Sequence, residues 1–357
     1  MRFPEFTGEW KLNILDSVCT FHNGRAYKQH ELLSAGKYRV LRVGNFFTND
    51  SWYYSDLELE EDKTASDGEL LYAWSASFGP RFWKGEKVIY HYHIWKIDSF
   101  QEVCKEFLFY FLEKDAASIK NEVQGGTMAH ITKADMERRN ITYPTICEQS
   151  KIARLLFLLD HRIATQNKII EKLQSLIKGL RVCCMQRVYG NNVYLSEIAQ
   201  IYQPQTISST ELTEDGFLVY GANGIIGKYK DYNHETEQIC ITCRGNTCGM
   251  VNYTKPMSWI TGNAMVINTD KYQDKVCKRY LYHYLSAYNF NSIISGSGQP
   301  QIVRTPLEKL KITLPTISEQ KQKAIIFDKI QDKIDINHKV LNLYIGQKQY
   351  LLRQMFI

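Results

Sequence analysis

Three cysteines are the most conspicuous candidate ligands in the sequence. Cys240 and Cys243 form a C-x-x-C pair and Cys248 follows shortly after, a spacing that opens many zinc sites. A structural zinc takes four ligands, and the fourth would have to be Cys277 or His283, without the usual second pair. We therefore favour buried thiols on a strand over a metal site. The chain has nine cysteines, an odd number in a long sequence, which predicts reduced thiols and no disulfide framework.

Sequence motifs of catalysis are missing. The chain contains no G-x-x-x-x-G-K-[ST] phosphate loop, no H-E-x-x-H zinc motif and no G-x-S-x-G nucleophile elbow. The glycine-rich run at 221–227 lacks the G-x-G-x-x-G spacing, and no long helical pattern follows it, so a turn between strands is expected there. The sequence therefore predicts a protein that is not an enzyme and that holds no metal or cofactor.

Basic and amide side chains gather on predicted turns. Arginine and lysine bind phosphates, while paired hydrogen bonds from arginine to guanine and from asparagine to adenine read the major groove. This chemistry suits duplex DNA, although a turn residue or a solvated charge explains each position taken alone. The candidate DNA contacts are Arg42, Asn45, Arg81 and Lys84 in the first half, and Tyr220, Asn223, Lys228, Arg244 and Asn246 in the second.

The net charge of +6 is unevenly distributed. The first 180 residues carry 24 basic and 24 acidic side chains, and the remaining residues carry 20 and 14. The first half is neutral largely because residues 56–69 hold seven acids and one lysine. Outside this stretch both halves are basic, which suits a phosphate-binding surface, although a solvated surface with one acidic loop fits the charge equally well.

The sequence of the elements that must position these side chains is repeated within the chain. The segment YPTICEQ at 143–149 returns as LPTISEQ at 314–320, an offset of 171 residues. Upstream of each copy lies a glycine-rich segment, at 125–128 and at 296–300, although the two differ in sequence. Such self-similarity predicts two repeats, each made of a globular region, a glycine-rich turn and a long helix.

Each copy opens a long helical pattern. The Thr-x-x-Glu spacings at 145–148 and 316–319 fit capping boxes. Apolar residues then recur at alternating spacings of four and three, the period of a coiled-coil seam, with one polar interruption at Gln166 and another at Asn337. We predict that the two helices pair antiparallel with Gln166 beside Asn337, which would fix their register; two independent helices are the alternative. A helix of about 33 residues would form a rod of roughly 50 Å.

The regions between the helices have a β-rich texture. The runs at 87–96, 238–243 and 264–268 are apolar and aromatic, and Gly and Asn dipeptides supply turns. We predict a mixed α/β (α+β) fold with two pseudo-repeated globular domains separated by two long antiparallel coiled-coil helices. The expected segments are 1–143 and 185–314 for the globular domains, and 144–184 and 315–357 for the helices.

The sequence shows no membrane or export signal. No apolar run approaches the roughly 18 residues that span a bilayer, and the first residues lack the apolar core of a secretory signal. We expect a cytoplasmic protein without a membrane partner.

Taken together, these features resemble the specificity subunit of type I restriction–modification enzymes over nearly the whole chain. The resemblance is carried by residues 1–10, 79–95, 219–227, 243–246 and 259–265, and by the repeated Pro, Glu and Gln at the helix starts. It implies two target-recognition domains that each read one half of a split duplex sequence, with the helices setting the spacer. It also implies two adenine-methylating subunits that bring S-adenosylmethionine and two restriction/translocase subunits that use ATP and Mg, with no cofactor in this chain.

Other functions remain open at this point. A coiled-coil scaffold would join partner proteins and bind DNA weakly, whereas a recognition subunit should lose DNA affinity steeply as salt rises. A solitary, inactive specificity protein without restriction partners would have the same sequence features. An enzyme would need a bound metal or a nucleotide that shifts its stability.

Overall fold

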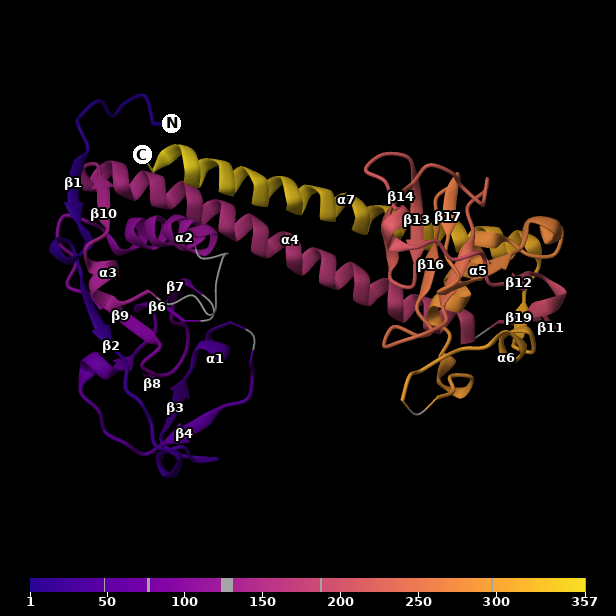
Figure 1. The fold of residues 1–357 in the computed structure, drawn as a ribbon, viewed down its shortest axis with the longest axis horizontal. Helices are drawn as coiled ribbons and strands as arrows, with labels where there is room; N and C mark the ends of the chain where they lie inside the picture. The colour runs from indigo at the N-terminus through magenta and orange to yellow at the C-terminus, as the bar shows by residue number, and fades with distance from the viewer. Residues whose placement is uncertain (48, 76–77, 123–130, 187, 297, 357) are drawn as a thin grey trace. The chain divides into compact units, whose positions relative to one another are not determined.

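The computed structural model describes residues 1–47, 49–75, 78–122, 131–186, 188–296 and 298–356 (Figure 1). The chain divides into two compact units: Met1–Thr165 with Leu341–Ile357, here the first unit, and Gln166–Val340, the second unit. The long helices α4 (Ile146–Gln186) and α7 (Ile317–Met355) each give part of their length to each unit. The four predicted segment boundaries stay a prediction. The glycine-rich segment at 125–128 lies outside the described residues.

In its described residues the first unit forms a two-stranded pair, β1–β10, and two four-stranded sheets. One sheet has the order β2–β9–β6–β7 and is antiparallel throughout. The other has the order β4–β3–β8–β5, in which β3 and β8 run parallel. The strands are β1 (Lys11–Ile14), β2 (Thr20–Asn23), β3 (Tyr38–Leu41), β4 (Tyr53–Ser55), β5 (Thr64–Ala65), β6 (Leu70–Ala73), β7 (Gly79–Phe82), β8 (Val88–Tyr90), β9 (Ile94–Asp98) and β10 (Asn140–Tyr143).

The second unit repeats this topology, except that among the described residues its mixed sheet has three strands where that of the first unit has four. It has the pair β11–β19, an antiparallel sheet of order β12–β18–β15–β16, and a sheet of order β14–β13–β17 in which β13 and β17 run parallel. Its strands are β11 (Asn191–Tyr194), β12 (Gln200–Tyr202), β13 (Phe217–Gly221), β14 (Gly224–Tyr229), β15 (Ile239–Thr242), β16 (Val251–Tyr253), β17 (Ser258–Ile260), β18 (Ala264–Asn268) and β19 (Lys311–Leu314). The predicted pseudo-repeat of mixed α/β domains is confirmed.

The shorter helices are also repeated. Helix α2 follows β9 in the first unit, as α5 follows β18 in the second, and a one-turn helix precedes the last strand of each. The helices are α1 (Val43–Phe47), α2 (Lys105–Glu122), α3 (Lys133–Glu137), α5 (Lys278–Ala287) and α6 (Arg304–Glu308). Within the described residues, none of the helices is both long and apolar enough to cross a membrane.

Apolar packing fixes each sheet against its helices. In the first unit the central strand β6 is buried along its whole length, and Tyr72 stacks on Trp95 with ring centroids 5.9 Å apart. Phe107 of α2 and Leu156 of α4 belong to the same fully buried cluster. Burying each such side chain contributes about 1.5–3 kcal/mol, so this core sets the position of the sheet on the helices.

A buried glutamine explains why the chain repeats its helix-start segment. Gln149 donates from Nε2 to the carbonyl oxygens of Pro144 (2.9 Å) and Glu102 (2.8 Å), and its Oε1 accepts from the backbone N–H of Cys104 (2.9 Å). Gln320 repeats these bonds with Pro315 (3.0 Å), Lys275 (3.2 Å) and Cys277 (2.9 Å). Each amide thus joins the start of a long helix to the segment before α2 or α5.

The two expected capping boxes differ. Glu319 N donates to Thr316 Oγ1 (3.3 Å) and Thr316 N donates to Glu319 Oε2 (3.1 Å), so the second box is confirmed. The first is wrong, because both carboxylate oxygens of Glu148 accept from the Arg2 guanidinium at 2.7 and 2.6 Å. The charged partner from the N-terminal segment replaces the backbone donor.

The long helices pair antiparallel within each unit. In the first unit Lys348 Nζ lies 2.7 Å from Asp160 Oδ1, and Arg162 lies 5.8 Å from the ring of Tyr344. In the second unit Gln166 Nε2 donates to the backbone oxygen of Asn337 at 3.3 Å and to its side-chain oxygen. The predicted neighbours are therefore in contact, while their role in fixing register stays a prediction. The buried seam residues include Ile152, Leu156, Leu159, Ile170 and Ile177 on α4, and Phe327, Ile334 and Leu351 on α7.

Candidate nucleic-acid interface

The parallel strand pair of the first unit brings several loops to one edge. Because β3 and β8 run parallel, the loops that follow them leave the same side of the sheet. His91 N donates to Leu41 O at 2.9 Å, and Arg25 N donates to Tyr90 O at 3.1 Å. Gly24 permits this approach, since a Cβ there would lie 2.3 Å from the His91 carbonyl oxygen. We call the segments 24–27, 42–47 (which includes α1), 49–53, 74–75 and 91–93 the first loop edge.

Arg42 and Asn45 both lie on the first loop edge but have different uses. Asn45 accepts from Arg42 Nε at 3.3 Å and donates to the carbonyl oxygens of Asn49 (2.8 Å) and Ser51 (2.7 Å). Its amide is thus occupied in bracing the loop. The Arg42 guanidinium lies 4.3 Å from the centroid of the Tyr53 ring, which holds the cation in place while leaving donors for a phosphate or a base.

The structure separates Arg81 from Lys84. Arg81 is exposed, and its guanidinium lies 4.8 Å from the ring of Phe47, the last residue of α1, so it reaches the first loop edge. Lys84 follows the other end of β7, where Phe82 pairs with Leu70 at the start of β6. Lys84 therefore lies away from the first loop edge and is not carried forward as a contact.

A cluster of rings on the first loop edge was missed in the sequence. The ring of His91 lies 6.3 Å from Tyr27 and 5.0 Å from His93, and Trp74 Nε1 donates to Tyr92 O at 2.9 Å. Tyr92 is 39% exposed. Burial, with smaller contributions from His93 and Arg42, lowers the pKa of His91 to about 4, so the ring is neutral near pH 7. The alternating aromatics suggested one continuous strand, and only the strand pairing shows a turn there.

The second unit forms an equivalent edge. Thr261 N donates to Tyr220 O at 2.9 Å, and Cys243 N donates to Asn263 O at 3.2 Å. Gln203 Nε2 donates to Gly262 O at 3.1 Å. These bonds join the ends of β12, β13, β15 and β17. We call the loops at 203–206, 222–223, 243–250 and 261–263 the second loop edge.

Three of the predicted contacts lie together on the second loop edge. Asn223, Arg244 and Asn246 are all exposed. Thr247 Oγ1 donates to Asn223 Oδ1, which leaves the Nδ2 donors of Asn223 without a hydrogen-bond partner among the described residues. Gly245 has φ +83° and donates its N–H to Pro300 O at 3.0 Å, which holds the loop in place. The edge thus presents an arginine and two amides, the chemistry of major-groove readout.

Tyr220 and Lys228 do not join this group. Tyr220 is 6% exposed and belongs to the core, its hydroxyl oxygen accepts from Lys255 N at 3.1 Å, and burial raises its pKa. Lys228 pairs with Leu218 at the far end of the β13–β14 hairpin, with Nζ 3.4 Å from Asp215. Neither side chain therefore lies at the second loop edge.

Four of the seven acids in the stretch 56–69 form ion pairs with lysines. Glu61 pairs with Lys87 and Glu69 with Lys96, each at 2.7 Å. Lys87 lowers the pKa of Glu61, chiefly through their hydrogen bond. Similar pairs join Lys37 to Glu58 and Lys63 to Asp62. Four of the seven acids thus pair with lysines of the same unit, so the neutral charge of the first half does not exclude a DNA-binding edge.

Of the three cysteines of the candidate cluster, Cys240 and Cys243 are buried and Cys248 is partly buried. Cys240 lies within β15, and burial raises its pKa to about 12. Cys243 Sγ donates to Asn263 O at 3.1 Å. Across the described ranges, no group of three or more His, Cys, Asp or Glu side chains is placed to hold a metal ion.

Comparisons with known proteins agree on one family. The family model for the type I restriction modification DNA specificity domain matches residues 7–175 and 191–343. The chain is 25% identical over 328 residues to the type I restriction enzyme MjaVIII specificity subunit of Methanocaldococcus jannaschii, covering 77% of this chain and 75% of that protein. It is 31% identical over 147 residues to the EcoprrI specificity subunit of Escherichia coli, covering 40% of this chain and 36% of that protein.

Solved structures show the same fold. The crystal structure of a type I restriction–modification S subunit from M. genitalium superposes with a TM-score of 0.68 at 18% identity, covering 100% of this chain and 99% of that chain. A chain from a study of complex assembly and conformational transition of the type I system gives a TM-score of 0.59 at 13% identity, covering 98% of both. Because the family model matches both repeats, the chain belongs to the type I restriction–modification DNA specificity family, whose members are DNA-recognition subunits.

Proposed function

We propose that this chain reads a bipartite duplex sequence, with the first loop edge on one half-site and the second loop edge on the other. The observation that carries this proposal is the duplication of an exposed edge with the donors of base readout. Arg244, Asn223 and Asn246 supply them on the second edge, and Arg42 and Arg81 on the first. The paired helices α4 and α7 would set the length of the unread spacer between the half-sites.

The partner proteins follow from the family. We propose that this chain assembles with two adenine-methylating subunits and two restriction/translocase subunits, in the cytoplasm where the DNA lies. S-adenosylmethionine, ATP and Mg would then reside on those partners, and this chain would contribute recognition without catalysis. Membership of the specificity family supports this division of roles.

Selection of bound duplexes from a random pool tests the proposal, using the purified chain with and without its methylation subunit. A bipartite consensus with a fixed gap is expected. Enrichment in neither condition would contradict DNA recognition and favour a coiled-coil scaffold. Affinity for the consensus should also fall steeply as salt rises, since phosphate contacts release counterions.

Matched alanine variants test which loop edge reads which half-site. Arg81→Ala should relax the first half-site and Arg244→Ala the second, because each removes a guanidinium from its loop edge. Lys84→Ala and Lys228→Ala remove a cation from the same units away from the edges. If the control variants relax the half-sites as much as the arginine variants do, the edges are wrongly assigned.

A further inference from the structure

Two adjacent isoleucines are exposed next to the second loop edge. Ile225 and Ile226 follow Gly224 at the start of β14, and they are 54% and 50% exposed. The loops after the parallel strands β13 and β17 leave the same side of their sheet. Because β14 runs antiparallel to β13, its first residues lie on that side as well. The two isoleucines therefore adjoin the turn that carries Asn223.

An irregularity in the strand pairing lies at these residues. Ile225 pairs with Tyr220, and the next pair along the two strands skips Ile226, which is thus an extra residue in β14. Such a β-bulge bends the strand and changes the direction of a side chain. Gly221 gives the extra residue room, since a Cβ there would lie 2.9 Å from Ile226 Cγ2. The local backbone therefore accommodates both exposed side chains.

Hydrogen bonds hold the turn before the isoleucines against the loop that carries Arg244. Thr242 Oγ1 donates to the backbone oxygen of Ala222, and Thr247 Oγ1 donates to Asn223 Oδ1. The turn and the loop therefore form one surface. An arginine, an amide and two aliphatic side chains are presented together on it.

Duplex DNA has one aliphatic group in its major groove. It is the C5 methyl group of thymine, which distinguishes thymine from cytosine beside the hydrogen-bonding groups of the base edges. An exposed isoleucine leaves apolar surface in water, and contact with this methyl group would bury part of it. Hydrogen-bond donors and aliphatic side chains on one surface are therefore complementary to a sequence that contains thymine.

The first unit differs at the equivalent place. Its strand β4 pairs with β3 as β14 pairs with β13, and β4 begins at Tyr53. The Arg42 guanidinium lies 4.3 Å from the centroid of the Tyr53 ring, so a cation and an aromatic ring occupy this position. The exposed aliphatic pair therefore belongs to the second loop edge, and the first half-site can serve as an internal control.

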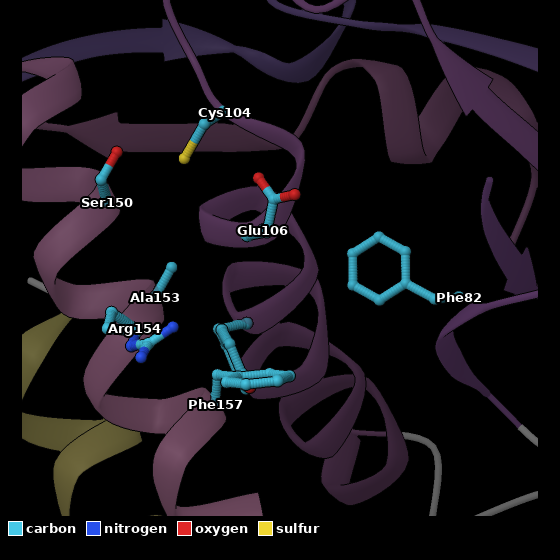
Figure 2. Close-up of a pocket in the computed structure, with 8 residues that line it drawn as sticks. Phe82, Cys104, Glu106, Ser150, Ala153, Arg154 and Phe157 are labelled. Carbon is cyan, nitrogen blue, oxygen red and sulfur yellow. The ribbon is translucent and has the colours of Figure 1, made fainter. Parts of the chain in front are cut away.

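Apolar side chains of the first unit also line a groove of about 340 Å³ between α2, α4 and β7. In Figure 2 Ala153 and Phe157 of α4 lie on one side of it and Phe82 on the other. The Phe82 ring stacks on Phe109, with centroids 4.9 Å apart. Phe82 also pairs with Leu70, at the end of the sheet opposite the first loop edge. This groove therefore lies away from the residues that would read bases.

We propose that Ile225 and Ile226 read the C5 methyl group of a thymine in the second half-site. The inference rests on the proposed function, because it needs the second loop edge to lie in the major groove. It adds an apolar contact to the hydrogen bonds that Arg244 and Asn223 would make. The second half-site should therefore contain a thymine whose methyl group is needed for full affinity.

Deoxyuridine tests the contact, since it lacks only the methyl group of thymidine. Each thymine of the half-site that Arg244→Ala relaxes is replaced in turn, and affinity is measured with the chain in the form that selected DNA. One replacement should lower the affinity of the wild-type chain about 4-fold, which corresponds to about 0.8 kcal/mol for one buried methyl group. The variant I225A/I226A should bind the thymine duplex at least about 4-fold more weakly and should no longer distinguish it from the uracil duplex.

Two controls come from the same chain and the same duplex. I336A removes a similarly exposed isoleucine from α7 and should keep the full response to uracil. Uracil at the thymines of the first half-site should affect the wild-type chain and I225A/I226A equally. The second control also shows that the variant is folded, since it requires the variant to read the first half-site.

The outcomes separate the inference from the proposed function. A second half-site without thymine, or one in which every thymine tolerates uracil, would overturn methyl readout. A loss with uracil that persists in I225A/I226A would place the methyl group against other residues and overturn the role of the isoleucines. In each of these cases the bipartite consensus still stands. If no consensus is selected at all, the proposed function has failed, and the inference fails with it.

Discussion

The buried glutamines at the helix starts allow a quantitative prediction. Gln149 and Gln320 are 0% and 1% exposed, and each makes three hydrogen bonds to the backbone. Each bond contributes about 1 kcal/mol, and an alanine would also leave buried backbone groups without partners. Gln149→Ala and Gln320→Ala should each lower the free energy of unfolding of their own unit by about 3–4 kcal/mol. That is a large part of the roughly 5–15 kcal/mol that stabilises a domain.

Hydrogen exchange at increasing urea measures this loss separately in each unit. Gln149→Ala should reduce protection around residues 102–104 and the start of α4, and Gln320→Ala around 275–277 and the start of α7. Gln322→Ala is the control, since it removes the same amide from an exposed position on α7. If both buried variants lose less than about 1 kcal/mol, or no more than Gln322→Ala, the hydrogen bonds do not hold the helix starts as argued.

Three further predictions concern DNA recognition and pH. Arg244→Ala should cost about 1–3 kcal/mol of binding to the consensus duplex and relax one position of the second half-site, as seen by repeating the selection. A second variant carries seven extra residues after Gln166 and seven before Asn337, which keeps the coiled-coil seam in phase and lengthens the helix pair by about 10 Å. The gap between the selected half-sites should then grow by about three base pairs. An unchanged gap would contradict the spacer role of the helices. The pKa of His91 is about 4 in the folded chain and 6.5 ordinarily, so the unfolded chain binds the proton first. Stability of the first unit should therefore fall by about 2 kcal/mol, after allowance for solvent screening, as pH drops from 6.5 to 4, and His91→Asn should remove that slope in urea titrations.

Repetition made the architecture readable from sequence. The segments YPTICEQ and LPTISEQ located both helix starts, because a proline and an acid at fixed positions mark where a helix begins. The repeat offset and the shared polar interruption of the seam predicted Gln166 beside Asn337, and the two side chains are in contact. The first capping box failed because Arg2, distant in sequence, takes the carboxylate of Glu148. Local patterns carry no information about such a partner.

The candidate contacts were harder to predict, because a turn residue's chemistry does not reveal which edge of a sheet it occupies. Lys84 and Lys228 have suitable charges, yet strand register places them away from the loop edges. Asn45 lies at the first loop edge, but its amide is used by the loop itself. The turn at 91–93 was hidden inside an alternating pattern that also fits a strand. Each of these outcomes depends on pairing between segments far apart in sequence.

The two repeats share the hydrogen bonds and strand pairing that hold the scaffold, and they differ in the residues exposed at the loop edges. The glutamine bonds, the order of the antiparallel four-stranded sheet and the parallel strand pair are the same in both units. The loop edges differ: the first presents rings around His91, and the second an arginine with two amides. A scaffold kept by internal hydrogen bonds can accept new edge residues without losing its fold, because those bonds do not involve the edges. The same scaffold can therefore carry two unlike sets of edge residues, as two unlike half-sites would need.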